Sequence, residues 1–190
     1  MRVERLVVAS HNPDKIAEIE AVLSETGAEI VRDLNWPEIE ENGSTLEENA
    51  LLKAGAVWRA TGLPALADDT GLFVTALGGL PGVHTARFAG PEATYSQNVA
   101  LLLEKLSGID EREAVFRTVV AVVSEAGELV AEGQLAGRIS HERRGESGFG
   151  YDPIFELESG QTLAELDSLE KNLISHRAQA LRNLARSLSI

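Results

Sequence analysis

The chain opens with short apolar runs that alternate with apolar residues at helical spacing. The apolar run at residues 6–9 predicts a buried strand. Beyond Pro13, which suits the first turn of a helix, apolar residues recur at helical spacing as far as Leu23, and Gly27 ends the pattern. A second strand is expected at residues 28–32. The opening therefore predicts a strand, a polar turn, a helix and another strand.

The next part of the chain predicts a capped helix followed by a strand. Residues 44–45 are Ser and Thr, which can cap a helix, and a glutamate three residues later completes a capping box. The helical pattern stops near the Gly-Leu-Pro sequence at residues 62–64. The apolar run at residues 65–67 then predicts a brief strand that ends in Asp68-Asp69-Thr70-Gly71.

The second half of the chain predicts a hairpin. Residues 78–90 are rich in glycine and predict a loop, whereas residues 98–106 predict an amphipathic helix. Two strand-like runs, at residues 115–124 and 128–139, are joined by Glu125-Ala126-Gly127, which predicts a β-hairpin.

A last helix is expected to begin at Ser175 or His176, because leucines recur at helical spacing after this point. Helices and strands thus alternate early in the chain and a hairpin follows later, which predicts an α/β fold with a mixed sheet. The 190 residues show no linker and no internal repeat, so a single domain over residues 1–190 is expected.

The composition narrows the class of protein. Hydrophobic residues make up 44% and charged residues 25%, as in ordinary globular domains, which argues against a disordered chain. The absence of cysteine excludes disulfides, thiolate metal sites and cysteine nucleophiles. The net charge of −13 disfavours nucleic acid and anionic membranes as partners, and no apolar run approaches the roughly 20 residues of a membrane helix. Because the N-terminus is too short and polar for a signal peptide, we expect a cytoplasmic location.

The first candidate site is the turn Ser10-His11-Asn12-Pro13-Asp14-Lys15, between the first strand and the first helix. The N–H groups and the dipole at a helix N-terminus favour an anion, to which Ser10, Asn12 and Lys15 can add donors and charge. The spacing is not that of a P-loop. The alternative interpretation is a plain strand–helix turn in which Asn12 is a turn former.

Two acidic segments are candidates for a metal site. Asp68 and Asp69 follow a predicted strand, where alternation allows only one of the two side chains to face a cleft. A carboxylate from Glu40-Glu41-Asn42-Gly43 can complete a site with Asp69, and Mg²⁺ prefers such oxygen ligands. The alternatives are a polar strand end for the first segment and a solvated acidic face for the second.

Two further segments combine aromatic and basic residues. The sequence Gly148-Phe149-Gly150-Tyr151-Asp152-Pro153 places aromatic rings among glycines, where a ring can stack on a base or fill a core. Lys171, His176 and Arg177 lie near the start of the predicted C-terminal helix, where cations oppose the helix dipole, and this unfavourable placement hints at function. No second histidine lies at ligand spacing from His176, which argues against a histidine metal site.

Taken together, these segments resemble the inosine triphosphate pyrophosphatase family, whose members hydrolyse deaminated purine nucleoside triphosphates. The resemblance runs in order over nearly the whole chain. Its motifs occupy residues 9–15, 41–50, 67–72, 77–88, 148–155 and 170–177. Ser10 stands where a Thr is common and Thr70 where a Ser is common, and both exchanges keep the hydroxyl group.

The resemblance implies an elongated mixed β-sheet with flanking helices that form two lobes around a central cleft. It also implies a homodimer, a Mg²⁺ requirement in which Mn²⁺ can substitute, and cleavage of ITP, dITP or XTP to the nucleoside monophosphate and pyrophosphate. Asp69 resembles the general base, and Asp69 and Glu41 resemble metal ligands. The residues that resemble substrate contacts are Ser10, His11, Asn12, Pro13, Asp14, Lys15, Lys53, Thr70, Phe149, Gly150, Tyr151, Asp152, Lys171, His176 and Arg177.

Three other interpretations are open. A related nucleotide pyrophosphatase could act on other bases, such as modified pyrimidines, although the segments at residues 149–152 and 171–177 disfavour this. A nucleotide-sensing module could bind without turnover, but a sensor has no need of a basic Asp69 beside a metal site. A purely structural α/β protein would not explain polar motifs that follow the family order.

Overall fold

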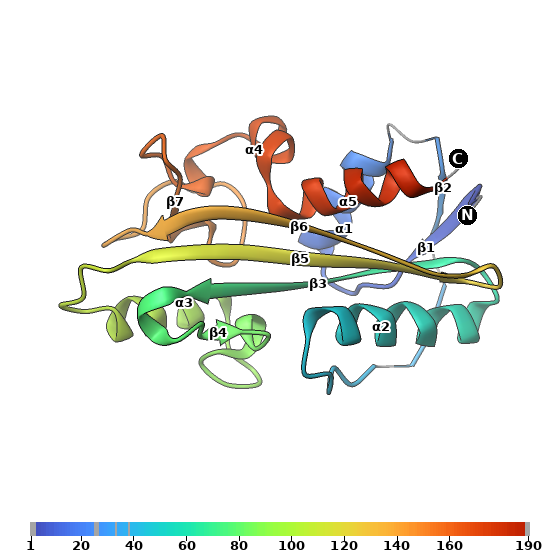
Figure 1. The fold of residues 1–190 in the computed structure, drawn as a ribbon, viewed down its shortest axis with the longest axis horizontal. Coiled ribbons are helices and arrows are strands. Elements are labelled where there is room, and N and C mark those ends of the chain that lie inside the picture. The colour runs from blue at the N-terminus through green and yellow to red at the C-terminus, as the bar shows by residue number, and fades with distance from the viewer. Residues whose placement is uncertain (1–2, 25–26, 33, 38, 189–190) are drawn as a thin grey trace. The chain divides into compact units, whose positions relative to one another are not determined.

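The protein is described by a computed structural model that covers residues 3–24, 27–32, 34–37 and 39–188. Helices and strands alternate in its first half, and a long hairpin follows (Figure 1). The strands are β1 (Arg5–Val8), β2 (Glu29–Val31), β3 (Ala65–Val74), β4 (Pro81–Gly82), β5 (Glu113–Ser124), β6 (Gly127–Ile139) and β7 (Phe155–Glu156). The α-helices are α1 (Pro13–Leu23), α2 (Leu46–Thr61), α3 (Tyr95–Lys105), α4 (Ser168–Ile174) and α5 (His176–Ser187). Short 3₁₀ helices are η2 (Thr75–Leu77), η3 (Thr85–Arg87), η4 (Asp152–Ile154) and η5 (Leu163–Glu165).

The strands form one mixed sheet in the order β2-β1-β3-β5-β6-β7, with β4 paired to β3. β1 runs parallel to both β2 and β3, with Leu6 opposite Ile30 and Val8 opposite Leu66. The pairs β3–β4 and β6–β7 are antiparallel. The predicted α/β class with a mixed sheet and flanking helices is therefore confirmed.

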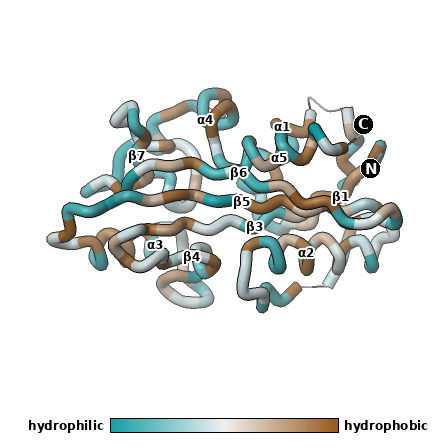
Figure 2. The backbone as a smooth tube through the Cα atoms, viewed as in Figure 1, coloured by the Kyte–Doolittle hydropathy of each residue, from teal (hydrophilic) through white to brown (hydrophobic). Residues whose placement is uncertain are grey.

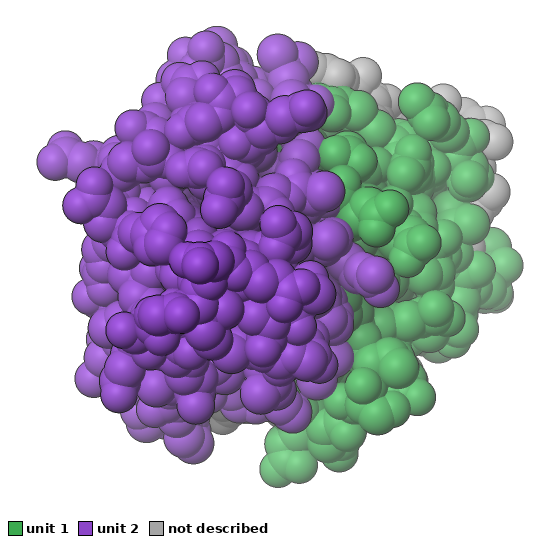
Figure 3. Space-filling view, turned by 60° about the vertical axis from the view of Figure 1, so that its left-hand side comes forward, with its two compact units in different colours: residues 1–70, 118–134, 175–190 green, residues 71–117, 135–174 purple. Residues whose placement is uncertain are grey.

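The chain divides into two compact units, coloured separately in Figure 3. Unit 1 consists of Met1–Thr70, Thr118–Gln134 and Ser175–Ile190, and unit 2 of Gly71–Arg117 and Leu135–Ile174. β3, β5 and β6 each continue from one unit into the other. Among the described residues, no helix is long and apolar enough to cross a membrane.

Each unit has its own hydrophobic core. In unit 1, α1 packs against α5, and the core includes Ile19 of α1 and Leu181 of α5. Hydrophobic residues line β1 and the C-terminal part of β5, as Figure 2 shows. In unit 2, Leu102 of α3 and Phe155 of β7 belong to a second cluster. β3 and α5, which carry several of the site residues described below, contribute buried residues to these cores.

The helix ends follow the expected capping. The Asn12 side chain caps α1, and Pro13 occupies its first turn. Thr45 and Glu48 form the capping box of α2, whose C-terminus is set by Gly62 with a φ of 71°. Ser175 caps α5. The predicted positions of these three helices are confirmed.

β3 differs from the prediction because it does not end at the polar sequence. The strand continues through Asp68 and Asp69 to Val74, and Leu72 and Val74 are buried in the unit 2 core. Gly71 lies against β4, where a Cβ would come within 2.9 Å of the Gly82 carbonyl oxygen. The polar residues therefore lie inside a strand rather than in a turn after it.

Candidate functional site

Two successive carboxylates of β3 organise the candidate site of unit 1. Asp68 and Asp69 are both buried, with 2% and 5% of their surfaces exposed. Because side chains alternate along a strand, the two contact different elements. Asp68 pairs with cations of α1 and α5, whereas Asp69 contacts polar residues of α2. The expected alternation of the pair is confirmed.

Asp69 is held from α2 through both of its carboxylate oxygens. Lys53 Nζ lies 3.2 Å from Asp69 Oδ1, and Asn49 Nδ2 donates to Asp69 Oδ2 over 3.2 Å. Lys53 Nζ also donates to Glu41 Oε1 over 3.0 Å. Two carboxylates that are far apart in the sequence therefore meet at one ammonium group.

The surroundings of Asp69 favour a basic carboxylate. Burial raises the pKa of Asp69, and the opposing charges of Lys53 and Lys15 do not cancel this effect. Burial alone would lower the pKa of Lys53, but the carboxylates of Asp69, Asp68 and Glu41 outweigh it and raise this pKa. Lys53 thus stays a cation between its two partners, and Asp69 is a better proton acceptor than an ordinary aspartate.

Asp68 has the opposite character. Burial alone would raise its pKa, but Lys15 and Arg177 hold the pKa of this carboxyl well below its usual range. Asp68 Oδ2 lies 3.2 Å from Lys15 Nζ and accepts from Arg177 Nε over 3.1 Å. The Thr70 hydroxyl donates to the same oxygen over 3.2 Å. Asp68 is therefore a fixed negative charge that orders the cations around it.

Arg177 and His176 extend this network. Arg177 Nη2 donates to Thr70 Oγ1 over 3.1 Å, and Arg177 Nη1 pairs with Glu18. The Thr70 and Thr118 hydroxyl oxygens are 2.7 Å apart, and Thr118 Oγ1 is 2.6 Å from His176 Nδ1. A continuous chain of hydrogen bonds therefore connects Asp68 to the first residue of α5.

Some polar groups of the turn before α1 form hydrogen bonds within the turn itself. Asn12 Oδ1 accepts from the backbone N–H groups of Asp14 and Lys15, over 2.9 and 3.3 Å, and Ser10 Oγ accepts from Asn12 N over 3.2 Å. The exposed His11 ring stacks on Trp36, with 5.1 Å between the ring centroids. Asn12 is thus a helix cap, and its neighbours Pro13 and Asp14 are exposed in the first turn.

A second group of predicted residues lies in unit 2. Lys171 Nζ lies 2.5 Å from Asp152 Oδ2 and 4.7 Å from the centroid of the Phe149 ring. The same Asp152 oxygen accepts from Phe149 N over 2.8 Å. Gly150 has a φ of 63°, in the region that favours glycine. Asp152 therefore holds a cation over an aromatic ring.

Tyr151 is part of the unit 2 core. Its ring is buried, its hydroxyl donates to the Thr85 carbonyl oxygen over 3.0 Å, and burial raises its pKa. Of the two expected uses of an aromatic ring in this turn, stacking on a base or filling a core, the Tyr151 ring has the second. The hydrogen bond of its hydroxyl group ties it to η3.

Apart from residues 10–14 of the turn before α1, the structure gathers the predicted residues into three groups. Glu41, Lys53 and Asp69 form the first, and the Asp68 network in unit 1 forms the second. The third group, around Phe149 and Lys171, belongs to unit 2. The sequence places Lys171 near His176 and Arg177, but Lys171 belongs to unit 2 and the other two to unit 1.

Three participants, Asn49, Glu18 and Thr118, are not candidates from the sequence. Asn49 lies four residues before Lys53, so helical spacing places both on one face of α2. Glu18 lies three residues after Lys15 in α1, so helical spacing likewise places these two on one face of that helix. Thr118 has no signal beyond being polar within an apolar strand.

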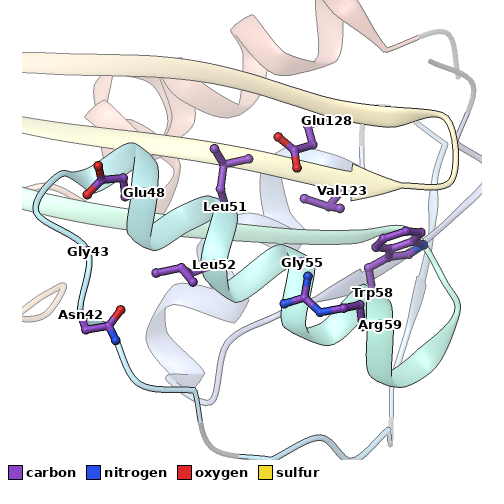
Figure 4. Close-up of a pocket in the computed structure, with 10 residues that line it drawn as sticks. All are labelled: Asn42, Gly43, Glu48, Leu51, Leu52, Gly55, Trp58, Arg59, Val123 and Glu128. Carbon is purple, nitrogen blue, oxygen red and sulfur yellow. The ribbon is translucent and has the colours of Figure 1, made fainter.

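A groove of about 530 Å³ runs along another face of α2 (Figure 4). It is lined by Asn42, Gly43, Glu48, Leu51, Leu52, Gly55, Trp58, Arg59, Val123 and Glu128. Its charged lining residues are Glu48, Arg59 and Glu128, and neither Glu41 nor Asp69 lines it.

The carboxylate pair suits a hard divalent cation. Within the described part of the chain, no group of three or more His, Asp or Glu side chains gathers for metal binding. Glu41 and Asp69 nevertheless converge on Lys53 Nζ, at 3.0 and 3.2 Å. Magnesium is often held by one or two carboxylates while a bound phosphate and water complete its coordination, and this pair fits that pattern.

Comparisons with known proteins agree with this architecture. The chain is 48% identical to a protein of Aromatoleum aromaticum and 48% identical to one of Methylococcus capsulatus, both named dITP/XTP pyrophosphatase; each alignment covers 97% of this chain and 96% of the relative. The solved HAM1 protein from Coxiella burnetii matches with a TM-score of 0.88 at 42% identity, over 98% of both chains. The Staphylococcus aureus Ham1 protein matches with a TM-score of 0.84 at 36% identity, over 96% of this chain and 97% of that one. The model of the Ham1 family matches residues 6–187, and the chain belongs to this family.

Proposed function

We propose that this protein hydrolyses deaminated purine nucleoside triphosphates, namely ITP, dITP and XTP, to the nucleoside monophosphate and pyrophosphate. The observation that carries the proposal is the buried Asp69 carboxylate, which meets Glu41 at the Lys53 ammonium. The name dITP/XTP pyrophosphatase, shared by relatives that align over nearly the whole chain, supports the same reaction. The activity is that of a nucleoside triphosphate pyrophosphatase.

We propose Mg²⁺ as the cofactor, with Mn²⁺ as a substitute, because both take oxygen ligands. Glu41 and Asp69 would hold the ion, and the two carboxylates fit an ion that also binds substrate phosphates. When bound, the ion would neutralise phosphate charge and favour ionisation of a bound water. In a chain with a net charge of −13, it would also help to admit a polyanion.

The chain's own residues would move the proton and balance the charge. Asp69 would accept a proton from the attacking water, because burial raises its pKa and makes it the more basic of the two aspartates. The water oxygen bonds to the α-phosphorus, the bond to the bridging oxygen breaks, and pyrophosphate leaves. Lys53 and Lys15 would stabilise charge on the phosphoryl oxygens.

The remaining predicted contacts divide into those with the triphosphate and those with the base. Ser10, Asn12 and Thr70, together with the adjoining His11, Pro13 and Asp14 of the turn, would form the triphosphate side. The base contacts in unit 2 would be Phe149, Gly150, Tyr151, Asp152 and Lys171. His176 and Arg177, in unit 1, are proposed as base contacts from the family resemblance alone. Phe149 offers a ring for stacking, and Lys171 offers ammonium donors to a keto oxygen of the base.

The test is a panel of nucleoside triphosphates incubated with Mg²⁺, in which pyrophosphate and orthophosphate are measured separately. The expected result is pyrophosphate release from ITP, dITP and XTP. Release of orthophosphate, or release from pyrimidine nucleotides alone, would contradict the proposed reaction.

We further propose a cytoplasmic homodimer whose single functional domain comprises both units. Leu80, in the glycine-rich loop before β4, is 50% exposed and offers an apolar contact, while Val83 and Phe88 are half-buried. An apolar side chain of this size gains stability when a second copy covers it. Light scattering at micromolar concentration tests this, because a monomeric mass would contradict the dimer.

A further inference from the structure

We propose that Asn49 is a positioning residue that fixes the separation and orientation of the Glu41 and Asp69 carboxylates. This inference rests on the function proposed above. Asn49 lies in α2 and is 1% exposed. A buried amide must find partners for both its donor and its acceptor, so its bonding pattern is informative.

The two ends of the Asn49 amide bind different parts of the site. Its Nδ2 donates to Asp69 Oδ2 over 3.2 Å, and its Oδ1 accepts from the backbone N–H of Gly43 over 2.8 Å. Because a backbone N–H can only donate, the oxygen of the amide must face Gly43 and its nitrogen must face Asp69. One side chain therefore ties β3 to the acidic loop that carries Glu41.

Lys53, one helical turn further along α2, makes the second connection between the same two parts. Its ammonium binds Asp69 Oδ1 and Glu41 Oε1, at 3.2 and 3.0 Å. Asn49 and Lys53 thus close a ring of interactions that runs through Asp69, the loop and back to α2. Without Asn49, Asp69 Oδ2 would lose this donor, and the carboxylate could rotate about its bond to Lys53.

Gly43 shows how closely the loop is seated on this ring. A Cβ at this position would lie 2.6 Å from Asn49 Oδ1 and 2.9 Å from Glu48 Cβ. The loop therefore approaches α2 as closely as a backbone without a side chain allows. The substitution Gly43→Ala would disturb the ring from the loop side without changing the chemistry of Glu41, Asp69, Asn49 or Lys53.

The test measures metal binding directly rather than turnover. Mn²⁺ is titrated into the full-length protein in the presence of the non-hydrolysable α,β-methylene analogue of ITP, and free Mn²⁺ is followed by electron paramagnetic resonance. Groups that orient metal ligands typically change metal affinity by roughly 10–100-fold when they are lost. We expect a rise of this size in the Mn²⁺ dissociation constant for Asn49→Leu and for Gly43→Ala. In the double variant the effects should be less than additive in free energy, because both break the same ring.

Asn98 provides a matched control. It is also a buried asparagine with 1% exposure, and its amide binds the backbone of Ala89 and Ala86 in unit 2. Asn98→Leu should destabilise the fold in a similar way yet leave the Mn²⁺ dissociation constant within about twofold. If Asn49→Leu fails to fold, Gly43→Ala carries the test.

The outcomes separate this inference from the proposed function. Parent-like Mn²⁺ affinity in both ring variants would overturn the positioning role and leave the proposed function intact. An equal loss of affinity in Asn98→Leu would also overturn it, because the effect would then be general loosening. A parent protein that hydrolyses ITP but binds no Mn²⁺ would remove the carboxylate pair as a metal site, and the positioning role with it.

Discussion

Asp68 and Asp69 are neighbours in the chain, yet they belong to opposite faces of β3 and to opposite electrostatic environments. Asp68 is paired with Lys15 and Arg177, which hold its pKa well below the usual range, whereas burial raises the pKa of Asp69. Two titratable groups with such divergent pKa values suit different tasks. Asp68 orders the cations of unit 1, and Asp69 is the one suited to accept a proton.

The first prediction concerns Asp69 as the general base. Asp69→Asn keeps the size of the side chain but removes its charge and basicity. We expect kcat for ITP to fall by at least about 10²-fold, the lower range for a lost general base. Far-UV circular dichroism and thermal unfolding should show an intact fold. Near-normal kcat in a folded, metal-saturated variant would remove Asp69 from the mechanism.

The second prediction concerns the metal. A chelator should abolish activity, and added Mg²⁺ or Mn²⁺ should restore it. Glu41→Gln removes one of the two carboxylates that meet at Lys53, so the Mg²⁺ concentration for half-maximal activity should rise. A Mg²⁺ titration of initial rates measures this shift. Full activity in excess chelator would contradict metal assistance.

The third prediction concerns Asp68 and the stability of unit 1. Removal of one partner from a buried ion pair typically costs about 3–5 kcal/mol, because the other charge is left buried without compensation. Asp68→Asn leaves Lys15 and Arg177 in this position, so we expect a loss of that size in the free energy of unfolding at pH 7. Urea unfolding measures it, and Asp110→Asn, at an exposed aspartate, serves as the control.

The dependence of this stability on pH has a definite sign. The pKa of Asp68 is lower in the folded protein than the value of about 3.9 for an unfolded aspartate. The ion pairs of Asp68 therefore contribute stability above about pH 4 and lose it as the pH falls further. Between about pH 5 and pH 3, the parent should lose more stability than Asp68→Asn. Equal slopes in the two proteins would show that Asp68 does not carry this charge effect.

Much of the fold could be predicted from local sequence signals. Thr45 with Glu48, and Gly62 at the end of the helix, set the bounds of α2, and the turn at residues 125–127 marks the hairpin. These signals act between residues close in the chain. α4 was not predicted, because its leucines, Leu169 and Leu173, are exposed and form no core-facing stripe.

The site was predictable only in part, because its partners come from distant segments. Polar residues such as Asp68 and Thr70 resemble a strand end until α1 and α5 supply cations to a buried position. Thr118 gains its importance from Thr70 and His176, which are 48 and 58 residues away. Sequence motifs marked Asp69, Glu41 and Lys53 as candidates, but the ring that Asn49 closes around them depends on tertiary contacts.

The fourth prediction concerns selection of the base. Hypoxanthine and xanthine carry a keto oxygen where adenine carries an amino group, and a buried donor left unpaired by the wrong base is costly. We expect kcat/KM to be highest for ITP and XTP. The value for GTP should be well below these two, and the value for ATP should be the lowest. Guanine is harder to reject because it shares the keto oxygen. Ribo and deoxy forms should both react if the contacts fall on the base and the phosphates.

Lys171 is the best single probe of this selection. Arg177 is a poorer choice, because its guanidinium also holds Asp68 and Glu18, so its removal would disturb unit 1 as a whole. Lys171→Met keeps an apolar stem beside Phe149 and removes the ammonium group with its donors and its charge. Its loss leaves Asp152 without this cation, so the informative quantity is the ratio of kcat/KM for ITP to that for ATP rather than either value alone.

We expect the Lys171→Met substitution to narrow that ratio by about tenfold or more, since one hydrogen bond to a charged donor is worth roughly 1.5–3 kcal/mol. Lys105→Met, at an exposed lysine in the last turn of α3, should leave the ratio unchanged. An unchanged ratio in Lys171→Met would mean that its ammonium does not read the keto oxygen, and selection would then rest on the other base contacts. Equal kcat/KM for ITP and ATP in the parent would remove base selection altogether, while leaving the pyrophosphatase chemistry at Asp69 in place.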